Sequence, residues 1–257
     1  MTVVGVVGDG CSTTALGIAA AWPEREPCVL AEFDPAGGCL AAWLDLPRSP
    51  GLAEVVASAN PGSWPIIESS LQRAASGVDV LVVPPRAVEA VAVLNAAAAS
   101  VLPVLAAIES PLVVADGGRL RGALSPLCNH SSIVVVAHRQ NAGSAAAAAL
   151  GLERVAELAA LLAARAIPCI VALVGDRPYN PLEVSEFVRA GAVVELADDP
   201  WAAAMLAGRA GSAVRLRRSP LMRSFTELGA LISATLRSAD LQADSPVFDE
   251  RWIDDHV

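Results

Sequence analysis

A turn rich in glycine and hydroxyl residues follows the first apolar run of the chain, in an order that could bind an anion. Val3–Val7 is apolar, Gly8–Thr14 reads Gly-Asp-Gly-Cys-Ser-Thr-Thr, and an alanine-rich stretch follows. Between a buried strand and a helix, backbone N–H groups at the helix N-terminus point at an anion, and glycines permit its close approach. The segment therefore predicts a phosphate-binding turn. The alternative is an ordinary strand-to-helix turn, in which glycine and threonine serve only as turn and cap residues.

Two aspartates stand at the ends of later apolar runs. Asp34 follows Cys28–Phe33, and Asp116 follows Leu112–Ala115. The carboxyl ends of parallel strands meet at one edge of a sheet, so both carboxylates are expected beside the first turn. Carboxylate and hydroxyl oxygens are ligands that Mg²⁺ accepts. The spacing predicts a magnesium site made by Thr13, Asp34 and Asp116, which forms only if a nucleotide binds.

Lysine is absent from the chain, since all 18 basic residues are arginine. This excludes Schiff-base chemistry, Ser-Lys dyads and the phosphate-binding lysine of ordinary P-loop enzymes. In addition, Asp9 places a carboxylate within the predicted turn, where it would repel phosphate. The arginines that follow strand ends, and could replace the missing charge, are Arg119, Arg139 and Arg177.

Composition excludes several other classes of protein. The five cysteines show no C-x-x-C spacing and the three histidines have no ligand-like spacing, which argues against disulfides and against zinc. A net charge of −9 argues against a nucleic-acid-binding protein. No apolar run is long enough to insert into a membrane, and the N-terminus carries no basic leader, so a cytoplasmic location is expected. His138 follows a strand end, and a small-molecule enzyme using it is a third alternative.

Apolar runs alternate with longer alanine- and leucine-rich stretches along the chain. This predicts an α/β fold with a mostly parallel, twisted sheet of about seven strands and helices on both faces. The clearest helix is expected over Ser144–Arg165. The predicted strands are Val3–Val7, Cys28–Phe33, Val78–Val83, Leu112–Ala115, Ile133–Ala137, Ile167–Val174 and Ala192–Leu196.

We expect one domain over residues 1–237 and an acidic, flexible tail over residues 238–257. The tail carries six acidic residues against Arg251, together with the apolar pairs Val247-Phe248 and Trp252-Ile253. An anionic bilayer would repel it. Docking on a protein is expected instead, either on a second copy near Arg215–Arg223 or on a basic partner.

The three motifs together resemble those of the MinD/ParA family of deviant P-loop ATPases, over roughly residues 2–236. Val7–Thr14 corresponds to the family's K-G-G-x-G-K-T-T loop, in which Val7 and Ser12 replace the two lysines and Cys11 replaces a glycine. Glu32-Phe33-Asp34-Pro35-Ala36-Gly37 corresponds to D-x-D-P-x-G, and Asp116 corresponds to the Walker B aspartate. Short relatives in the pilus and secretion branch, such as TadZ and CpaE, position such machinery at a cell pole.

The resemblance implies a P-loop fold, a homodimer, and a protein partner such as a secretion ATPase. It places Asp34 on the catalytic side and Arg177 near the base site. The remaining nucleotide-binding positions that it implies are Gly8, Asp9, Gly10, Cys11, Ser12, Thr13 and Thr14. Without the lysines, efficient hydrolysis is not expected. A degenerate localisation or assembly factor and a slow Mg²⁺-dependent ATPase, completed by an arginine or a partner in trans, both stay open. The cofactor also stays open: the chain binds either ATP or ADP with Mg²⁺, or no cofactor.

Overall fold

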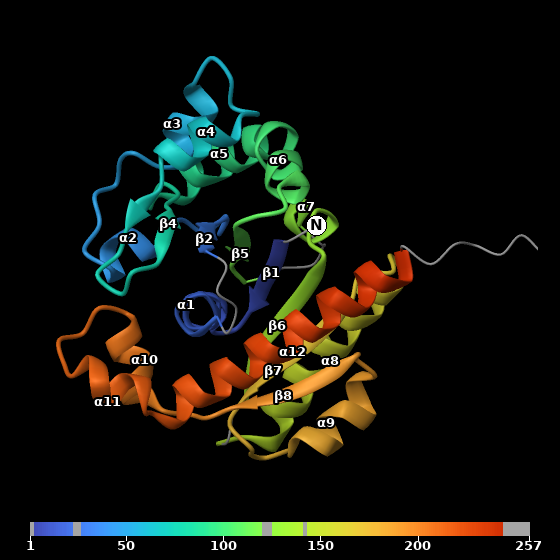
Figure 1. The fold of residues 1–257 in the computed structure, drawn as a ribbon. Coiled ribbons are helices and arrows are strands. Elements are labelled where there is room, and N and C mark those ends of the chain that lie inside the picture. Colours follow the sequence, from blue (N-terminus) through green and yellow to red (C-terminus); the bar gives the residue numbers. More distant parts are fainter. Residues whose placement is uncertain (1–2, 23–26, 120–124, 141–142, 244–257) are drawn as a thin grey trace, which may run out of the picture.

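The computed structural model describes residues 3–22, 27–119, 125–140 and 143–243. Its centre is an eight-stranded sheet with the order β3-β4-β2-β5-β1-β6-β7-β8 (Figure 1). Every neighbouring pair is parallel except β3 and β4. The strands are β1 (Val3–Gly8), β2 (Cys28–Glu32), β3 (Gln72–Arg73), β4 (Asp79–Leu81), β5 (Leu112–Asp116), β6 (Ile133–Arg139), β7 (Cys169–Val174) and β8 (Ala192–Leu196).

The predicted α/β class and the seven parallel strands are confirmed. The eighth strand, β3, was missed because it has only two residues and no apolar run; it pairs antiparallel with β4 at the edge of the sheet. β1 lies between β5 and β6, at the centre of the sheet. The turn that follows β1 is therefore flanked by the loops that follow β5 and β6.

Central strands are apolar on both faces because helices cover both faces (Figure 1). In β1, Val4 and Val6 pack in the cluster that contains α1 and α12, whereas Val3 and Val7 pack in the clusters on the opposite face. The alternation follows from the two-residue period of a strand. All four side chains are at most 1% exposed.

The helices divide between the two faces according to these clusters. On one side lie α1 (Cys11–Ala21), α2 (Leu40–Trp43), α10 (Pro200–Leu206), α11 (Ala213–Arg217) and α12 (Pro220–Ala243). On the other lie α3 (Leu52–Ala57), α4 (Trp64–Ser69), α5 (Ala87–Ser100), α6 (Leu102–Ala107), α7 (Pro126–Asn129), α8 (Ala145–Ala163) and α9 (Pro181–Val188).

α1 and α12 pack closely because Gly17 leaves room for the ring of Phe225. Any side chain at Gly17 would collide with that ring, which is 1% exposed. This contact holds α1, and the turn that precedes it, against the longest helix of the fold.

α12 continues to Ala243, six residues past the boundary expected at residue 237. The rest of the predicted tail, residues 244–257, lies outside the described residues. Among the helices that the structure describes, none is long and apolar enough to cross a membrane.

Candidate functional site

The turn between β1 and α1 is shaped by two glycines with positive φ. Gly8 has φ +105° and packs so closely on the carbonyl of Ala137 in β6 that a Cβ would collide with it. Gly10 has φ +91° and precedes the first residue of α1. Nothing lies within 4 Å of the place where its Cβ would be, so the turn opens to solvent there.

The N-terminus of α1 has no side-chain cap. The first hydrogen bond of the helix runs from the N–H of Thr14 to the carbonyl of Gly10, at 3.0 Å. The N–H groups of Cys11, Ser12 and Thr13 come before it. In any α-helix the N–H groups of the first turn have no acceptor within the helix. Together with the helix dipole, these donors favour an anion at this position.

Asp116 is fully buried at the end of β5, beside β1. Its Oδ1 accepts a hydrogen bond from the N–H of Gly118 at 3.1 Å, whereas Oδ2 has no hydrogen-bond partner among the described residues. Burial raises the pKa of this carboxyl above its usual range and outweighs the nearby Ser12 hydroxyl, the N–H of Gly118 and the Cys11 thiol, which all act to lower it; the charge of Asp34 adds a smaller upward effect. A buried carboxylate oxygen without a partner is costly unless a cation or a proton satisfies it.

Asp34 is half-buried at the loop after β2, and its carboxylate lies against Gly118, where a Cβ would collide with it. Its Oδ1 accepts a hydrogen bond from the N–H of Ala36 at 2.7 Å. The loop that carries Gly118 is tied to β1, since the N–H of Gly8 donates to the carbonyl of Gly118 at 3.1 Å. The structure thus brings Asp34 and Asp116 together beside the first turn.

Sequence reasoning gave no role of its own to Glu32, which stands opposite Asp116 across β2 and β5 and is fully buried. One carboxylate oxygen accepts from the N–H groups of Cys39 at 2.6 Å and Leu40 at 2.9 Å. The other accepts from the N–H of Val83 at 3.1 Å. Burial raises the pKa of this carboxyl. Glu32 therefore connects the start of α2 to the segment that follows β4.

Replacing Glu32 with alanine is expected to destabilise the fold by about 3–5 kcal/mol, because three N–H groups lose their acceptor and two of these hydrogen bonds are buried. For a chain of this size, that corresponds to a fall in melting temperature of roughly 10 °C. Glu32→Gln keeps the shape and one acceptor oxygen, so its loss should be clearly smaller. Thermal unfolding followed by circular dichroism compares the two variants. Equal melting temperatures would show that these hydrogen bonds contribute little.

Cys11 and Ser12 occupy the first turn of α1, with Sγ and Oγ 3.9 Å apart. Cys11 is 4% exposed, and burial, reinforced by the charge of Asp116, raises the pKa of its thiol well above its usual range. The thiol is therefore protonated at neutral pH and is not a reactive thiolate. Ser12 and Thr13 are partly exposed at the turn, whereas Thr14 is buried.

The carboxylate of Asp9 is neutralised by an arginine. Arg119 Nη2 lies 2.8 Å from Asp9 Oδ1, with the two side chains 70% and 46% exposed. Arg119 is thereby the one of the three candidate arginines that the structure places at the turn. Arg139 instead pairs with Asp198 at 2.8 Å, and Arg177 lies exposed after β7, which β6 separates from β1.

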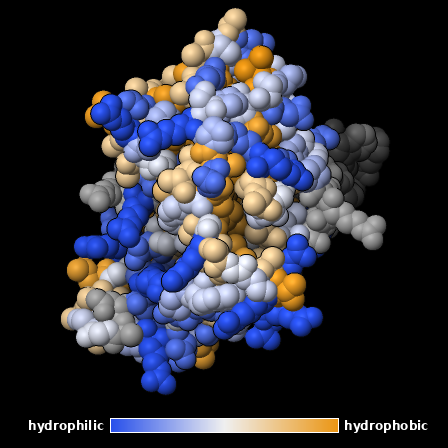
Figure 2. Space-filling view, turned by 90° about the vertical axis from the view of Figure 1, so that its left-hand side faces the viewer, coloured by the Kyte–Doolittle hydropathy of each residue, from blue (hydrophilic) through white to orange (hydrophobic). Residues whose placement is uncertain are grey.

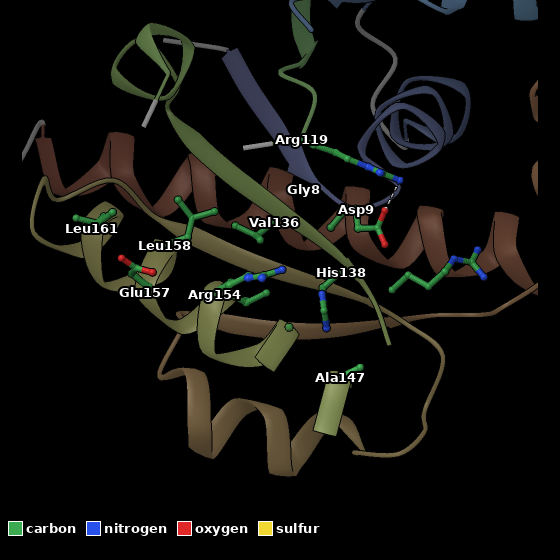
Figure 3. A pocket seen from close by; sticks show the side chains of 14 residues that line it. Gly8, Asp9, Arg119, Val136, His138, Ala147, Arg154, Glu157, Leu158 and Leu161 are labelled. Carbon is green, nitrogen blue, oxygen red and sulfur yellow. Dashed lines mark ion pairs between the residues drawn. The ribbon is translucent and has the colours of Figure 1, made fainter. Parts of the chain in front are cut away.

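A hollow of about 760 Å³ extends from the turn along β6 to α8. Figure 3 shows Asp9 and Arg119 facing each other at its edge, with His138 and Arg154 farther along. Burial lowers the pKa of His138, so its ring is neutral, and Gly151 packs against it. The lining residues that the structure describes include no serine, cysteine or threonine nucleophile beside this histidine. The geometry therefore gives no support to an enzyme that uses His138.

No protein-family model and no curated protein matches this sequence. Solved structures do match its fold. A ParA family ATPase from Chlorobium tepidum TLS aligns over 89% of this chain and 97% of its own, with a TM-score of 0.67 and 14% identity. MinD of Pyrococcus horikoshii OT3, complexed with Mg-ADP, aligns over 90% and 95%, with a TM-score of 0.66 and 13% identity.

The MinC:MinD cell division protein complex of Aquifex aeolicus aligns over 91% of this chain and 96% of the matched chain. Its TM-score is 0.67, at 12% identity. This chain has the fold of the ParA and MinD ATPases. At such low identity the similarity concerns the fold. The chemistry available to this chain depends on the turn, Asp34, Asp116 and Arg119.

Proposed function

We propose that this chain is a degenerate MinD/ParA-like protein that binds a magnesium nucleotide weakly and acts as a localisation or assembly factor through protein contacts. One observation carries the nucleotide part of the proposal: an uncapped helix N-terminus lies beside a fully buried aspartate whose Oδ2 has no partner among the described residues. Donors for an anion and an acceptor for a cation thus lie side by side, as a magnesium diphosphate requires.

Different groups at this site would bind the phosphates and the magnesium ion. The first-turn N–H groups of α1 would hold phosphate oxygens, and Gly10 leaves the space above them open. Thr13, Asp34 and Asp116 would hold Mg²⁺, which neutralises phosphate charge. MinD of Pyrococcus horikoshii OT3, which has a similar fold, is complexed with such a magnesium nucleotide, Mg-ADP. Arg177 is kept as a proposed contact at the base site.

Weak hydrolysis is proposed because the turn has no cationic side chain that is free to contact phosphate. Ser12 stands at the position of the phosphate-binding lysine, and a hydroxyl cannot stabilise the charge that develops in phosphoryl transfer as a cation does. Arg119 is adjacent, but its guanidinium is already paired with Asp9. Asp34 is the proposed catalytic-side carboxylate if hydrolysis occurs.

A second candidate function, a slow Mg²⁺-dependent ATPase, is favoured by that same arginine. Both partners of the Asp9–Arg119 pair are substantially exposed, and exposed ion pairs stabilise a protein by at most about 1 kcal/mol. A bound phosphate can therefore compete with Asp9 for Arg119 at modest cost. A partner protein or a second copy could supply further charge in trans. The two candidates differ in turnover and share the binding site.

A role in positioning other proteins, such as a pilus or secretion apparatus with its ATPase, follows from the resemblance of the motifs. The MinD fold also occurs in a complex with a second protein, MinC. A homodimer is proposed on the same grounds. Such a role needs only a ligand-dependent surface, which weak binding without rapid turnover can provide.

Titrating labelled ADP and ATP, with and without Mg²⁺, tests the proposal, and phosphate release separates the two candidates. Arg119→Gln is expected to weaken Mg²⁺-dependent binding about tenfold, because a hydrogen bond to a charged phosphate is lost. Arg139→Gln removes an exposed arginine that pairs with Asp198 and serves as the matched control. The absence of nucleotide binding in the unmodified chain would refute the site. Equal affinities for the unmodified chain and Arg119→Gln would exclude a contact between Arg119 and phosphate and would leave the rest of the site untouched.

A further inference from the structure

Five exposed arginines crowd the face formed by α10, α11 and the start of α12. They lie within fifteen residues that contain no acidic residue: Arg209, Arg215, Arg217, Arg218 and Arg223. In the part of the chain that the structure describes, none of the five makes an ion pair. Figure 2 looks onto this side of the molecule, where hydrophilic and hydrophobic side chains mix over the lower half. The face therefore carries an excess of positive charge on a protein whose net charge is −9.

A hollow of about 480 Å³ opens between these arginines. Its lining combines apolar and cationic side chains, Trp201, Val214, Arg215 and Arg218, with Asp199, Ser212, Ser219 and Pro220. The Arg215 guanidinium lies over the Trp201 ring, 4.4 Å from its centroid, and Val214 is 62% exposed. Asp199 is the acidic residue of this lining, and its carboxylate accepts the N–H of Ala202 at 3.0 Å as the cap of α10. The hollow suits a ligand that is acidic and carries apolar side chains.

We propose that this hollow binds residues 244–257 of a second copy of the chain. That segment contains five acidic residues and one arginine, and it carries Val247-Phe248 and Trp252-Ile253 between the acids. Its charge complements the arginines, and its apolar side chains match Trp201 and Val214. Opposite charge fixes partner choice, while buried apolar and aromatic side chains carry most of the affinity.

Chain length favours a second copy over the same chain. The hollow lies at the start of α12, beside Pro220, and the acidic segment begins after its last residue, Ala243. Twenty-four helical residues separate the two by about 36 Å. If the segment folded back fully extended, Val247-Phe248 would lie only about 15 Å along that path, and Trp252, at about 31 Å, would stop short of the hollow. In a second copy no such limit applies, and the whole segment can lie across the arginines.

Isotope-coded crosslinking of the full chain tests both the site and its occupant. A photo-reactive phenylalanine analogue at Phe248 is introduced into chains labelled with ¹⁴N or ¹⁵N, which are mixed in equal amounts without nucleotide or Mg²⁺. We expect crosslinks to residues 199–223, with mixed ¹⁴N–¹⁵N pairs making up about half of them, as random pairing between two chains requires. Crosslinks confined to single-isotope pairs would show that the segment binds its own chain. Crosslinks elsewhere would exclude the hollow.

Sedimentation of the full chain gives the energetic test. Arg215→Glu with Arg218→Glu is expected to weaken self-association at least tenfold, and 0.5 M salt should weaken it similarly in the unmodified chain. Arg48→Glu with Arg165→Glu is the control, because it changes the net charge equally at exposed positions far from the hollow in sequence. This variant should change self-association little. Equal effects of the two double variants would overturn the proposal. So would a chain that is monomeric at all concentrations. Because nucleotide is absent throughout, none of these outcomes depends on the proposed nucleotide site.

Discussion

Replacing Asp116 with asparagine is expected to raise the melting temperature of the protein while abolishing Mg²⁺-dependent nucleotide binding. Asp116 is fully buried, its Oδ2 has no partner among the described residues, and burial raises its pKa. Asparagine removes the buried charge and keeps the shape. We expect about 1–2 kcal/mol of added stability, or roughly 2–8 °C. Binding should be lost because a neutral amide is a poor ligand for Mg²⁺.

The gain in stability should depend on pH. Because the pKa of Asp116 is raised in the folded protein, the unfolded chain ionises first as pH rises above about 4. The stability of the unmodified chain then falls relative to the variant until the folded carboxyl also ionises. Thermal unfolding at pH 5 and pH 8 should therefore show the larger gain at pH 8. Asp176→Asn changes an exposed aspartate and should leave the melting temperature unchanged. An Asp116→Asn variant that is less stable and still binds the magnesium nucleotide would contradict the proposed site.

Changing Asp9 to glycine and Ser12 to lysine together is expected to raise nucleotide affinity ten- to a hundredfold. The first change removes a carboxylate from the turn and releases Arg119 from its ion pair. The second places a cation in the first turn of α1, where the N–H groups lack a side-chain cap. Charge-assisted hydrogen bonds to phosphate are the strong ones, so both changes act in the same direction.

Calorimetry with ADP and ATP in the presence of Mg²⁺ measures this gain. Asp9→Gly with Ser12→Gln is the matched control, because glutamine has a long polar side chain without the charge. If the lysine variant binds no better than this control, then the shape of the turn, and not just its charge, differs from that of the ParA and MinD ATPases. A rise in phosphate release with the rise in affinity would favour the slow ATPase over the degenerate assembly factor.

The sequence by itself was sufficient for those features that depend on local pattern. Buried parallel strands are apolar along their whole length, so Val3–Val7 and Ile133–Ala137 could be predicted without knowing their neighbours. Asp34 and Asp116 end such runs, and parallel strands present their carboxyl ends at one edge, so their approach to the first turn follows from topology. The absence of lysine needs no structure at all.

Tertiary structure alone decided which loops and edges meet. The ion pair of Arg119 with Asp9 joins residues 110 positions apart, and it requires β5 to lie directly beside β1. Glu32 appears in the sequence as the first acid of a motif, but its three N–H partners are Cys39, Leu40 at the start of α2, and Val83, two residues after β4. β3 is too short for any periodicity and exists because β4 offers it an edge. Periodicity reports which face of an element is buried, whereas long-range partners depend on strand order, which no local pattern encodes.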